Sequence, residues 1–168
     1  MNKLYFITGA SGSGKTTLIK NLEKKNLRGV ETFIFDSVGV PSEEEMKEKY
    51  GSGEKWQKET TKYWVRKIKE SYLDKSDVVL DGSINYDFIE EACKQFKLQN
   101  FKIILIDCSD EERKKRLIDR GQGELYNQDM INWSQSLRKT AIEKNYTIID
   151  NTNYSQEETL EELLGYLN

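Results

Sequence analysis

Residues 9–16 read GASGSGKT, and this stretch decides how the rest of the chain is interpreted. It matches the pattern G-x-x-x-x-G-K-[ST] at every fixed position, and it stands between an apolar run at residues 4–8 and a helical segment. Glycines let such a loop curl until successive backbone N–H groups point into one concavity, and the following helix adds the positive end of its dipole. The segment therefore predicts an anion-binding loop, although a flexible Gly-Ser turn has a similar composition.

The predicted loop carries the groups that a nucleoside triphosphate requires. Lys15 would reach the β- and γ-phosphates of ATP or GTP as a mobile positive charge, and Thr16 would offer its hydroxyl to a bridging Mg²⁺. The residues expected to contact the nucleotide here are Gly9, Ser11, Gly12, Ser13, Gly14, Lys15, Thr16 and Thr17. Nucleotide binding is thus the first functional interpretation.

Length and composition indicate one folded domain over residues 1–168. Apolar residues make up 36% of the chain and charged residues 33%, and the apolar ones fall in dense runs. The net charge of -3 argues against a general nucleic-acid-binding surface. No segment has the apolar length of a signal-peptide core or a membrane span, so we expect a cytoplasmic protein without a membrane partner, acting as a monomer or homodimer.

The residue types that are scarce limit the chemistry. Cys93 and Cys108 are too few for a disulfide framework, and no Cys/His cluster exists for zinc, so we expect two buried free thiols. Histidine is absent. Acid–base chemistry must therefore use Asp, Glu, Lys, Tyr or water, and a Ser-His-Asp site is excluded.

Strand-like and helical segments alternate along the chain. Short runs rich in β-branched and aromatic residues lie at residues 4–8, 32–35, 78–80, 102–106 and 146–149. Longer charged segments with helical spacing separate them. Parallel strands need crossover connections, so this order predicts an α/β fold in which helices cover both faces of a parallel sheet, a three-layer α/β/α arrangement.

Three further segments carry a resemblance to a known family. Residues 78–82 read VVLDG, residues 104–120 read ILIDCSDEERKKRLIDR, and residues 148–152 read IIDNT. Together with the glycine-rich loop, the chain resembles the small P-loop kinases related to adenylate, shikimate and gluconate kinases over nearly its whole length. The resemblance implies a five-stranded parallel sheet in the order 2-3-1-4-5. It also implies an acceptor-binding insertion at about 37–73, a mobile lid at about 120–137, and Asn151 on the adenine side of the nucleotide.

The helix that the resemblance places before the lid bears three arginines. Arg113, Arg116 and Arg120 are spaced i, i+3, i+7 and share one face of a helix. Guanidinium groups on one face suit a phosphoryl group in transfer, whose charge spreads over three equatorial oxygens. Arg116 and Arg120 are the candidates for catalysis, and Arg116 also for nucleotide binding. The alternative is a solvated helix whose arginines pair with neighbouring carboxylates.

Two aspartates follow apolar strands at the edge where open parallel sheets bind ligands. Asp81 is the candidate for a water-mediated contact to Mg²⁺, and an Asp-Gly turn without function is the alternative. Asp36, at the end of the second strand, is the candidate general base for an acceptor hydroxyl. Shikimate-type kinases often have Asp-x-Asp here, whereas residues 36–38 read DSV. Asp36 could therefore be the base, a magnesium ligand, or a strand-end turn residue.

The insertion contains an apolar stripe at helical spacing: Trp56, Tyr63, Trp64, Ile68 and Tyr72. These side chains could stack on an acceptor, but packing in the core is the commoner use of aromatic rings. Ser42 and Glu45 form the pattern of a capping box and predict a helix start.

The patterns together favour an ATP- and Mg²⁺-dependent phosphotransferase that acts on a small hydroxyl- or phosphate-bearing acceptor. The N-K-x-D and L-S-G-G-Q strings of GTPase and ABC proteins do not occur. A nucleoside or nucleotide is the preferred acceptor, ahead of a sugar or an antibiotic. The alternative from another class is a regulatory ATP-binding module or slow NTPase, in which no acceptor is phosphorylated.

Overall fold

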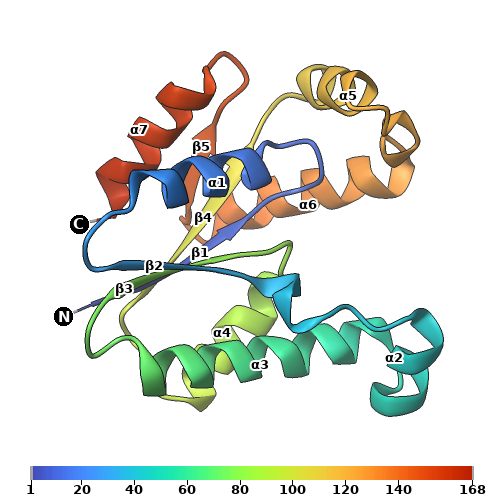
Figure 1. Ribbon diagram of the computed structural model, residues 1–168. Coiled ribbons are helices and arrows are strands. Elements are labelled where there is room, and N and C mark those ends of the chain that lie inside the picture. The colour runs from blue at the N-terminus through green and yellow to red at the C-terminus, as the bar shows by residue number, and fades with distance from the viewer. Residues whose placement is uncertain (1, 168) are drawn as a thin grey trace.

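A computed structural model describes residues 2–167 (Figure 1). Its five strands form one parallel sheet in the order β2-β3-β1-β4-β5, which confirms the predicted fold class and strand order. The strands are β1 (Leu4–Thr8), β2 (Val30–Ile34), β3 (Asp77–Asp81), β4 (Phe101–Asp107) and β5 (Thr147–Asp150). The predicted apolar runs thus locate all five strands, with ends displaced by at most two residues.

Helices connect the strands and cover both faces of the sheet (Figure 1). The α-helices are α1 (Lys15–Lys25), α2 (Glu43–Tyr50), α3 (Gly53–Ser71), α4 (Tyr86–Gln95), α5 (Asp110–Asp119), α6 (Gln128–Glu143) and α7 (Gln156–Tyr166). Two short 3₁₀ helices are η1 (Phe35–Val38) and η2 (Gly123–Leu125). No helix within residues 2–167 combines the length and the apolar character needed to cross a membrane.

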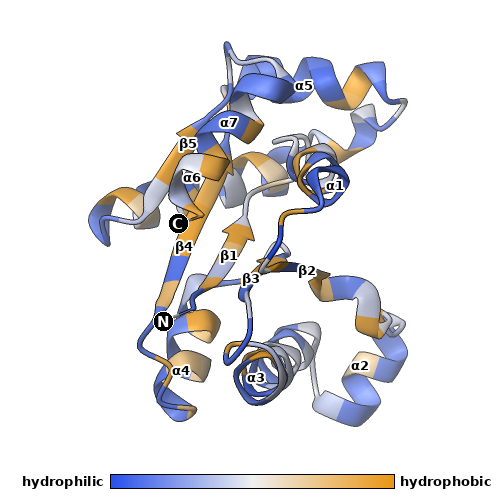
Figure 2. Cartoon of the chain, turned by 60° about the vertical axis from the view of Figure 1, so that its left-hand side comes forward, coloured by the Kyte–Doolittle hydropathy of each residue, from blue (hydrophilic) through white to orange (hydrophobic). Residues whose placement is uncertain are grey.

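Two hydrophobic cores lie on opposite faces of the sheet, because successive strand side chains alternate between faces. On one face Leu4 and Phe6 pack with buried residues of α3, α4 and α6. On the other face Tyr5 and Ile7 pack with buried residues of α1 and α7. The hydropathy colouring in Figure 2 accordingly shows β1 and β4 as largely apolar strands between helices with polar outer faces. This is the three-layer arrangement expected from the alternation.

The carboxyl end of β2 differs from the prediction. The strand ends at Ile34, and Phe35 begins the 3₁₀ helix η1, so Asp36 lies within that helix and not at the strand end. Burial of Phe35 explains the early turn, since its ring packs edge-on against Trp56 and its carbonyl oxygen accepts a 3.0 Å hydrogen bond from Trp64 Nε1. The aromatic residues of α3 therefore fix the position of η1.

The apolar stripe of α3 packs mainly in the core, which is the commoner use of aromatic side chains. Trp56, Trp64 and Ile68 are buried, whereas the Tyr63 side chain is 41% exposed. The predicted capping box is also confirmed at the start of α2: Glu45 N donates to Ser42 Oγ at 3.2 Å, and Ser42 N donates to the Glu45 carboxylate at 2.9 Å.

Candidate phosphate-binding cleft

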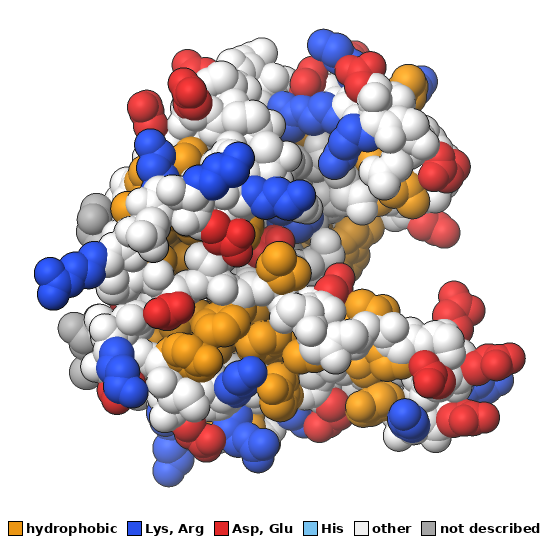
Figure 3. Space-filling view, viewed as in Figure 1, with side chains coloured by type: hydrophobic (Ala, Val, Ile, Leu, Met, Phe, Trp, Pro, Cys, Tyr) orange, Lys and Arg blue, Asp and Glu red, His pale blue; other side chains and the backbone are white. Residues whose placement is uncertain are grey.

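A cleft opens at the carboxyl ends of β1, β2 and β3, with a cavity of about 620 Å³. Figure 3 shows the molecule hollowed between the part that carries α5 and the part that carries α2 and α3. The cavity is lined by Ala10, Ser11, Gly12, Gly14, Lys15, Thr16, Thr17, Lys20, Ile34, Asp36, Asp81, Gly82, Ser83, Leu117, Arg120, Gln122 and Leu125. The glycine-rich loop, three strand ends and the segment after α5 therefore meet at one site.

The cavity includes many of the residues predicted for the site but not all. Of the loop residues, those that line it are Ser11, Gly12, Gly14, Lys15, Thr16 and Thr17. Asp36, Asp81 and Arg120 line it as well. Gly9 and Ser13 belong to the loop but are buried and do not line the cavity. Arg116 and Asn151 support the loop from the side away from the cavity. The structure thus separates residues that face the cleft from residues that shape it.

The start of α1 is suited to an anion. Its N-cap is Gly14, with a φ of +96°, and no side chain caps the helix or places a carboxylate in the first turn. The other six α-helices each have a Ser or Asn cap and an acidic residue in the first turn. The free N–H groups and the positive end of the α1 dipole are therefore left for a ligand.

The back of the loop is pressed against α5. Gly12 has a φ of +82°, and a Cβ there would approach Arg113 Cγ to 2.9 Å and Leu117 Cγ to 3.0 Å. The backbone thus requires glycine for both its conformation and its space. Asn151 Nδ2 donates to the Ser13 carbonyl oxygen at 2.9 Å, so the loop is also tied to the chain after β5.

Lys15 folds back over its own loop. Its Nζ donates to the carbonyl oxygens of Gly9, at 2.5 Å, and Ala10, at 3.4 Å. Burial lowers the pKa of Lys15, while the negative charge of Asp81 opposes that shift. The ammonium is thus held at the edge of the cleft by neutral carbonyl groups that a phosphate oxygen could replace.

Asp81 carries a carboxylate oxygen that lacks a partner. The residue is 7% exposed, and its Oδ1 is buried without a hydrogen-bond partner among residues 2–167. Burial raises the pKa of Asp81 to about 6; the Asp36 carboxylate adds to this and Lys15 opposes it. Asp36, Asp81 and Lys15 line the same cavity.

These residues fit a magnesium site. Mg²⁺ keeps several waters and is bound through one or two carboxylates together with substrate phosphates. Asp81 supplies an unpartnered oxygen, and the exposed Thr16 lines the same cavity. No group of three or more His, Cys, Asp or Glu side chains that could hold a metal by itself occurs in the described part of the chain.

The three arginines of α5 and its C-terminal end all lie toward the glycine-rich loop, as the predicted shared face requires, but in three different environments. Arg120 lines the cleft. Arg116 donates to Glu112 at 2.9 Å, to Asn151 Oδ1 at 2.9 Å and to the Ser13 carbonyl oxygen at 3.4 Å. It therefore braces the loop, and its pairing with Glu112 follows the alternative of a helix with internal ion pairs.

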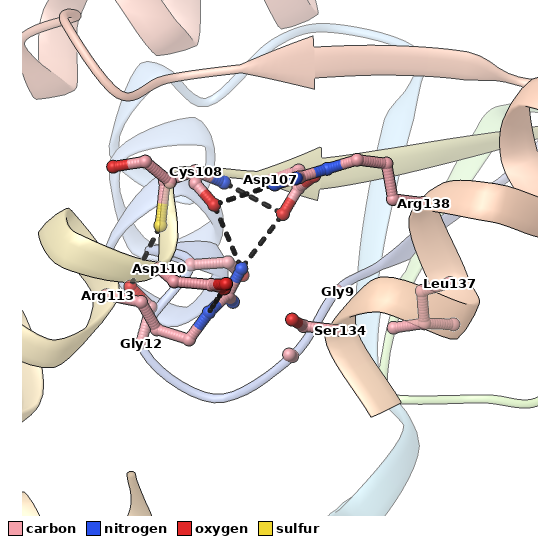
Figure 4. Close-up of polar contacts among 12 residues, drawn as sticks. Gly9, Gly12, Asp107, Cys108, Asp110, Arg113, Ser134, Leu137 and Arg138 are labelled. Atoms are coloured by element: carbon pink, nitrogen blue, oxygen red, sulfur yellow. Dashed lines mark hydrogen bonds and ion pairs between the residues drawn. The ribbon is translucent and has the colours of Figure 1, made fainter. Parts of the chain in front are cut away.

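Arg113 is 0% exposed and forms part of a buried ionic cluster that the sequence analysis missed (Figure 4). Its NH2 donates to Asp107 Oδ1 and to the Cys108 carbonyl oxygen, each at 3.0 Å. Arg138 Nε, from α6, donates to the other oxygen of the Asp107 carboxylate at 2.5 Å. The only signal in the sequence was Asp107 at the end of an apolar strand, and that position does not indicate which residues pair with its carboxylate. Arg113 is thus structural and lies behind the loop.

Two further cleft residues were also missed. Lys20 lies one helical turn after Thr16 and lines the cavity, a position that the i, i+4 spacing could have indicated. Ser83 lines it too, and its Oγ donates to the Gly9 carbonyl oxygen at 3.0 Å. Gln57 of α3 holds this segment, because its Nε2 donates to the Ser83 carbonyl oxygen at 3.1 Å and its Oε1 accepts from Asn85 N at 3.1 Å. Residues 37–73, the predicted acceptor-binding insertion, are thus hydrogen-bonded through Gln57 to the segment that lines the cleft.

The loop, the sheet order and the cleft define the P-loop class of nucleotide-binding folds. The sequence profile of the AAA domain family matches residues 6–132, which is most of the chain. The chain therefore belongs to the AAA domain family. No curated protein matches the sequence significantly.

Solved structures of small P-loop kinases share the fold. A sugar kinase from Janibacter sp. HTCC2649 superimposes with a TM-score of 0.67 at 16% identity, over 99% of this chain and 95% of that one. A gluconokinase from Sinorhizobium meliloti 1021 gives 0.64 at 17% identity, over 98% and 91%. Shikimate kinase from Acinetobacter baumannii, in complex with shikimate, gives 0.63 at 16% identity, over 99% and 93%. At these identities the likeness establishes the fold that the sequence motifs resembled.

Proposed function

We propose that this chain is an ATP-dependent phosphotransferase that moves the γ-phosphate of Mg-ATP to a small acceptor. The observation that carries the proposal is the composition of one cleft: a phosphate-binding loop with an uncapped helix start, an arginine, and two carboxylates all line the same cavity. A phosphoryl transfer needs little more than positioned charges and an acceptor for one proton.

The nucleotide is held by the loop. Backbone N–H groups of Gly12 and Gly14 and the start of α1 bind the phosphates, while Lys15 exchanges its carbonyl partners for β- and γ-phosphate oxygens. Asn151 and Arg116 contribute by fixing the Ser13 carbonyl group and hence the curvature of the loop. Mg²⁺, held by Thr16 and through water by Asp81, would neutralise charge on the β- and γ-phosphates.

The remaining site residues have roles in the transfer step. The acceptor hydroxyl oxygen attacks the γ-phosphorus, the bond from that phosphorus to the β–γ bridging oxygen breaks, and the hydroxyl proton passes to Asp36. The products are ADP and a phosphate monoester. Lys15 and Arg120 stabilise the equatorial oxygens, and Arg116 supports the reaction through the loop. Asp36 is the proposed base because Asp81, with its buried oxygen, is better suited to the metal.

Two segments of the chain complete the proposed enzyme. Residues 37–73 bind the acceptor, and residues 120–137 act as the lid, since Arg120, Gln122 and Leu125 already line the cleft from that side. Closure would exclude water, which otherwise competes for the γ-phosphate. The two free, buried cysteines suit a reducing compartment such as the cytoplasm.

We propose a small hydroxyl- or phosphate-bearing compound as the acceptor. Nucleosides and nucleotides are our first class to test, and sugars and antibiotics the second. The names of the structural neighbours, a sugar kinase, a gluconokinase and a shikimate kinase, support a small hydroxyl compound in general.

The direct test supplies γ-labelled ATP, Mg²⁺ and pools of nucleosides, nucleotides, sugars and aminoglycosides, with products resolved by mass spectrometry. A labelled phosphoester that is absent with the Lys15→Ala variant is the expected result. Labelled inorganic phosphate as the only product in every pool would instead indicate a slow NTPase or regulatory module and contradict the proposal.

A further inference from the structure

One backbone oxygen beside the cleft accepts hydrogen bonds from two side chains. The carbonyl oxygen of Gly9, the first residue of the loop, accepts from Lys15 Nζ at 2.5 Å and from Ser83 Oγ at 3.0 Å. Lys15 begins α1, whereas Ser83 follows β3 and is 74 residues away from Gly9 in the sequence. Two donors from different elements therefore share this oxygen, which has a lone pair for each.

The Gly9 carbonyl group has little freedom to find another donor. Gly9 is buried, and a Cβ at this position would clash with the Ile106 carbonyl oxygen of β4 and lie 2.8 Å from Ser13 Oγ. The peptide is therefore packed too closely to turn its carbonyl group elsewhere. A buried carbonyl group that loses its last partner makes the state in which this happens less favourable by about tenfold in its equilibrium constant.

Nucleotide binding removes one of the two donors. In the proposed function the Lys15 ammonium leaves the carbonyl oxygens of Gly9 and Ala10 for phosphate oxygens. The Ala10 carbonyl oxygen then keeps a backbone partner, because Ser13 N donates to it at 3.2 Å. Within residues 2–167, the Gly9 carbonyl oxygen keeps the Ser83 hydroxyl alone. The loop thus depends on Ser83 more when the nucleotide is bound than when it is free.

The surrounding chain holds Ser83 in place for this contact. Gln57 of α3 donates to the Ser83 carbonyl oxygen at 3.1 Å and accepts from Asn85 N at 3.1 Å. On the other side, Gly82 N donates to the Ile7 carbonyl oxygen of β1 at 3.0 Å. The segment after β3 is therefore tied both to the insertion and to the strand that leads into the loop, and the hydroxyl is positioned before a nucleotide binds.

We propose that Ser83 is a positioning residue that satisfies the Gly9 carbonyl group when Lys15 moves to the phosphates. The proposal rests on the nucleotide-binding part of the proposed function and adds to it a residue from outside the loop. Ser83 acts through the Gly9 carbonyl oxygen: its hydroxyl favours the nucleotide-bound loop over the free loop, in which Lys15 is already a partner. It thereby makes the ammonium easier to release.

The test measures nucleotide affinity and nucleotide-free stability in the same variants. Isothermal titration calorimetry with Mg²⁺ and a non-hydrolysable ATP analogue gives the Kd, and urea denaturation gives the midpoint. We expect Ser83→Ala to raise the Kd about tenfold and to leave the midpoint unchanged, because Lys15 still holds the carbonyl group in the free protein. Ser83→Thr keeps a hydroxyl and should bind like wild type. Ser71→Ala, at the exposed end of α3, is the control and should change neither quantity.

A double-mutant cycle with Lys15→Ala reverses the expectation. Without the ammonium, Ser83 is the side-chain partner of the Gly9 carbonyl group in the free protein and in the bound protein alike. Adding Ser83→Ala to Lys15→Ala should therefore lower the urea midpoint and leave the already weakened affinity unchanged. A hydroxyl that merely stabilised the fold would lower the midpoint equally in both backgrounds and would affect the Kd in neither.

Each outcome has a defined meaning. Equal affinity of wild type and Ser83→Ala, or an equal loss of stability in both backgrounds, overturns the role of Ser83 and leaves the proposed function intact. A tenfold loss that Ser83→Thr does not restore overturns it too, because the hydroxyl would not be the cause. If the cycle behaves as expected but no acceptor is phosphorylated, the proposed phosphotransfer fails and the role of Ser83 stands. Absence of nucleotide binding by the wild type overturns both.

Discussion

At the scale of residues, three charged side chains line the same cleft: Lys15, Asp36 and Asp81. The Lys15 ammonium influences the Asp81 carboxyl, and the Asp36 carboxylate opposes that influence. The buried Asp81 Oδ1 has no hydrogen-bond partner in the described chain, so it is available to a ligand. The following predictions test each of these groups.

Lys15→Ala should weaken Mg-nucleotide binding about 100-fold, roughly 3 kcal/mol, because a charge-assisted contact to the phosphates is lost. Isothermal titration calorimetry with a non-hydrolysable ATP analogue measures this, and circular dichroism verifies the fold. Lys24→Ala removes the same charge from an exposed position on α1 and should bind normally. Equal affinity in both variants would refute the role of Lys15.

Asp36→Asn should lower kcat by about 10²- to 10⁴-fold, the usual range for loss of a general base. The KM for ATP should change less than kcat, because Asp36 belongs to η1 and not to the loop that holds the phosphates. Steady-state kinetics with the identified acceptor provide both values. Asp74→Asn is the control, since that carboxylate is exposed and outside the cleft. Full turnover by Asp36→Asn would instead leave Asp36 as a turn residue.

The raised pKa of Asp81 predicts how stability depends on pH. Its folded value of about 6 exceeds the ordinary 3.8, so the folded state binds the proton more tightly than the unfolded state. Stability from this group is therefore fully present below about pH 4 and is lost as pH rises through 6, by roughly 3 kcal/mol in total.

Urea unfolding in magnesium-free buffer measures this effect as a difference between variants. Asp81→Asn should gain stability relative to wild type as the pH rises, by about 2 kcal/mol between pH 4.5 and pH 7.5, because only the wild type carries the penalty of a buried charge. A difference that is the same at both pH values would show that Asp81 is not perturbed as described.

At the scale of elements, the back of the loop packs against α5 and is tied to the chain after β5. Arg113 contacts the Gly12 backbone and binds Asp107 at the end of β4, and Arg138 brings α6 to the same carboxylate. The cluster thus links α5, which precedes the proposed lid, to the part of α6 that follows it. The proposed lid would therefore move while the residues at its two ends are held in place by these ion pairs.

Removing one partner of a buried pair leaves an uncompensated charge, so Arg113→Met should lower the free energy of unfolding by about 3 kcal/mol or more. Arg138→Met should cost less, because its side chain is 39% exposed and water can replace part of the contact. Equilibrium urea denaturation gives both values. Equal losses would contradict the difference in burial.

The sequence predicts these elements unevenly, and the reasons are physical. Apolar runs located β1 and β4 because burial on both faces demands them. The cluster was not predictable, since Asp107 and Arg138 are 31 residues apart and helical spacing says nothing of such a pairing. The same limit applies to Arg113 and Arg120, whose common face was inferred from spacing but whose burial depends on what packs against α5.

At the scale of the whole molecule, local signals and tertiary packing agree on the nucleotide side and leave the acceptor side open. The loop at residues 9–16 could be predicted from its motif, because few sequences adopt the curled backbone of a phosphate-binding loop. The opposite side of the cleft has no such motif, and the sheet alone brings Ile34, Asp81 and Ser83 together there. This side of the cleft therefore needed the three-dimensional arrangement to be seen.

The buried thiols offer a test of global packing. Cys93 and Cys108 are both free and buried, and burial raises the pKa of the Cys93 thiol to about 12. Ellman's reagent at pH 8 should therefore react slowly with the native protein and rapidly with two thiols in concentrated urea. Fast reaction in the native state would mean that the structure opens readily around these two thiols.

One measurement addresses the central claim, that main-chain N–H groups at the start of α1 bind the phosphates of a magnesium nucleotide. Amide NMR spectra of ¹⁵N-labelled protein are recorded during titration with Mg²⁺ and a non-hydrolysable ATP analogue. The account predicts that the largest shifts fall on residues 12–16. A titration in which these amides stay unchanged, or in which the largest shifts lie outside the cleft, would contradict it.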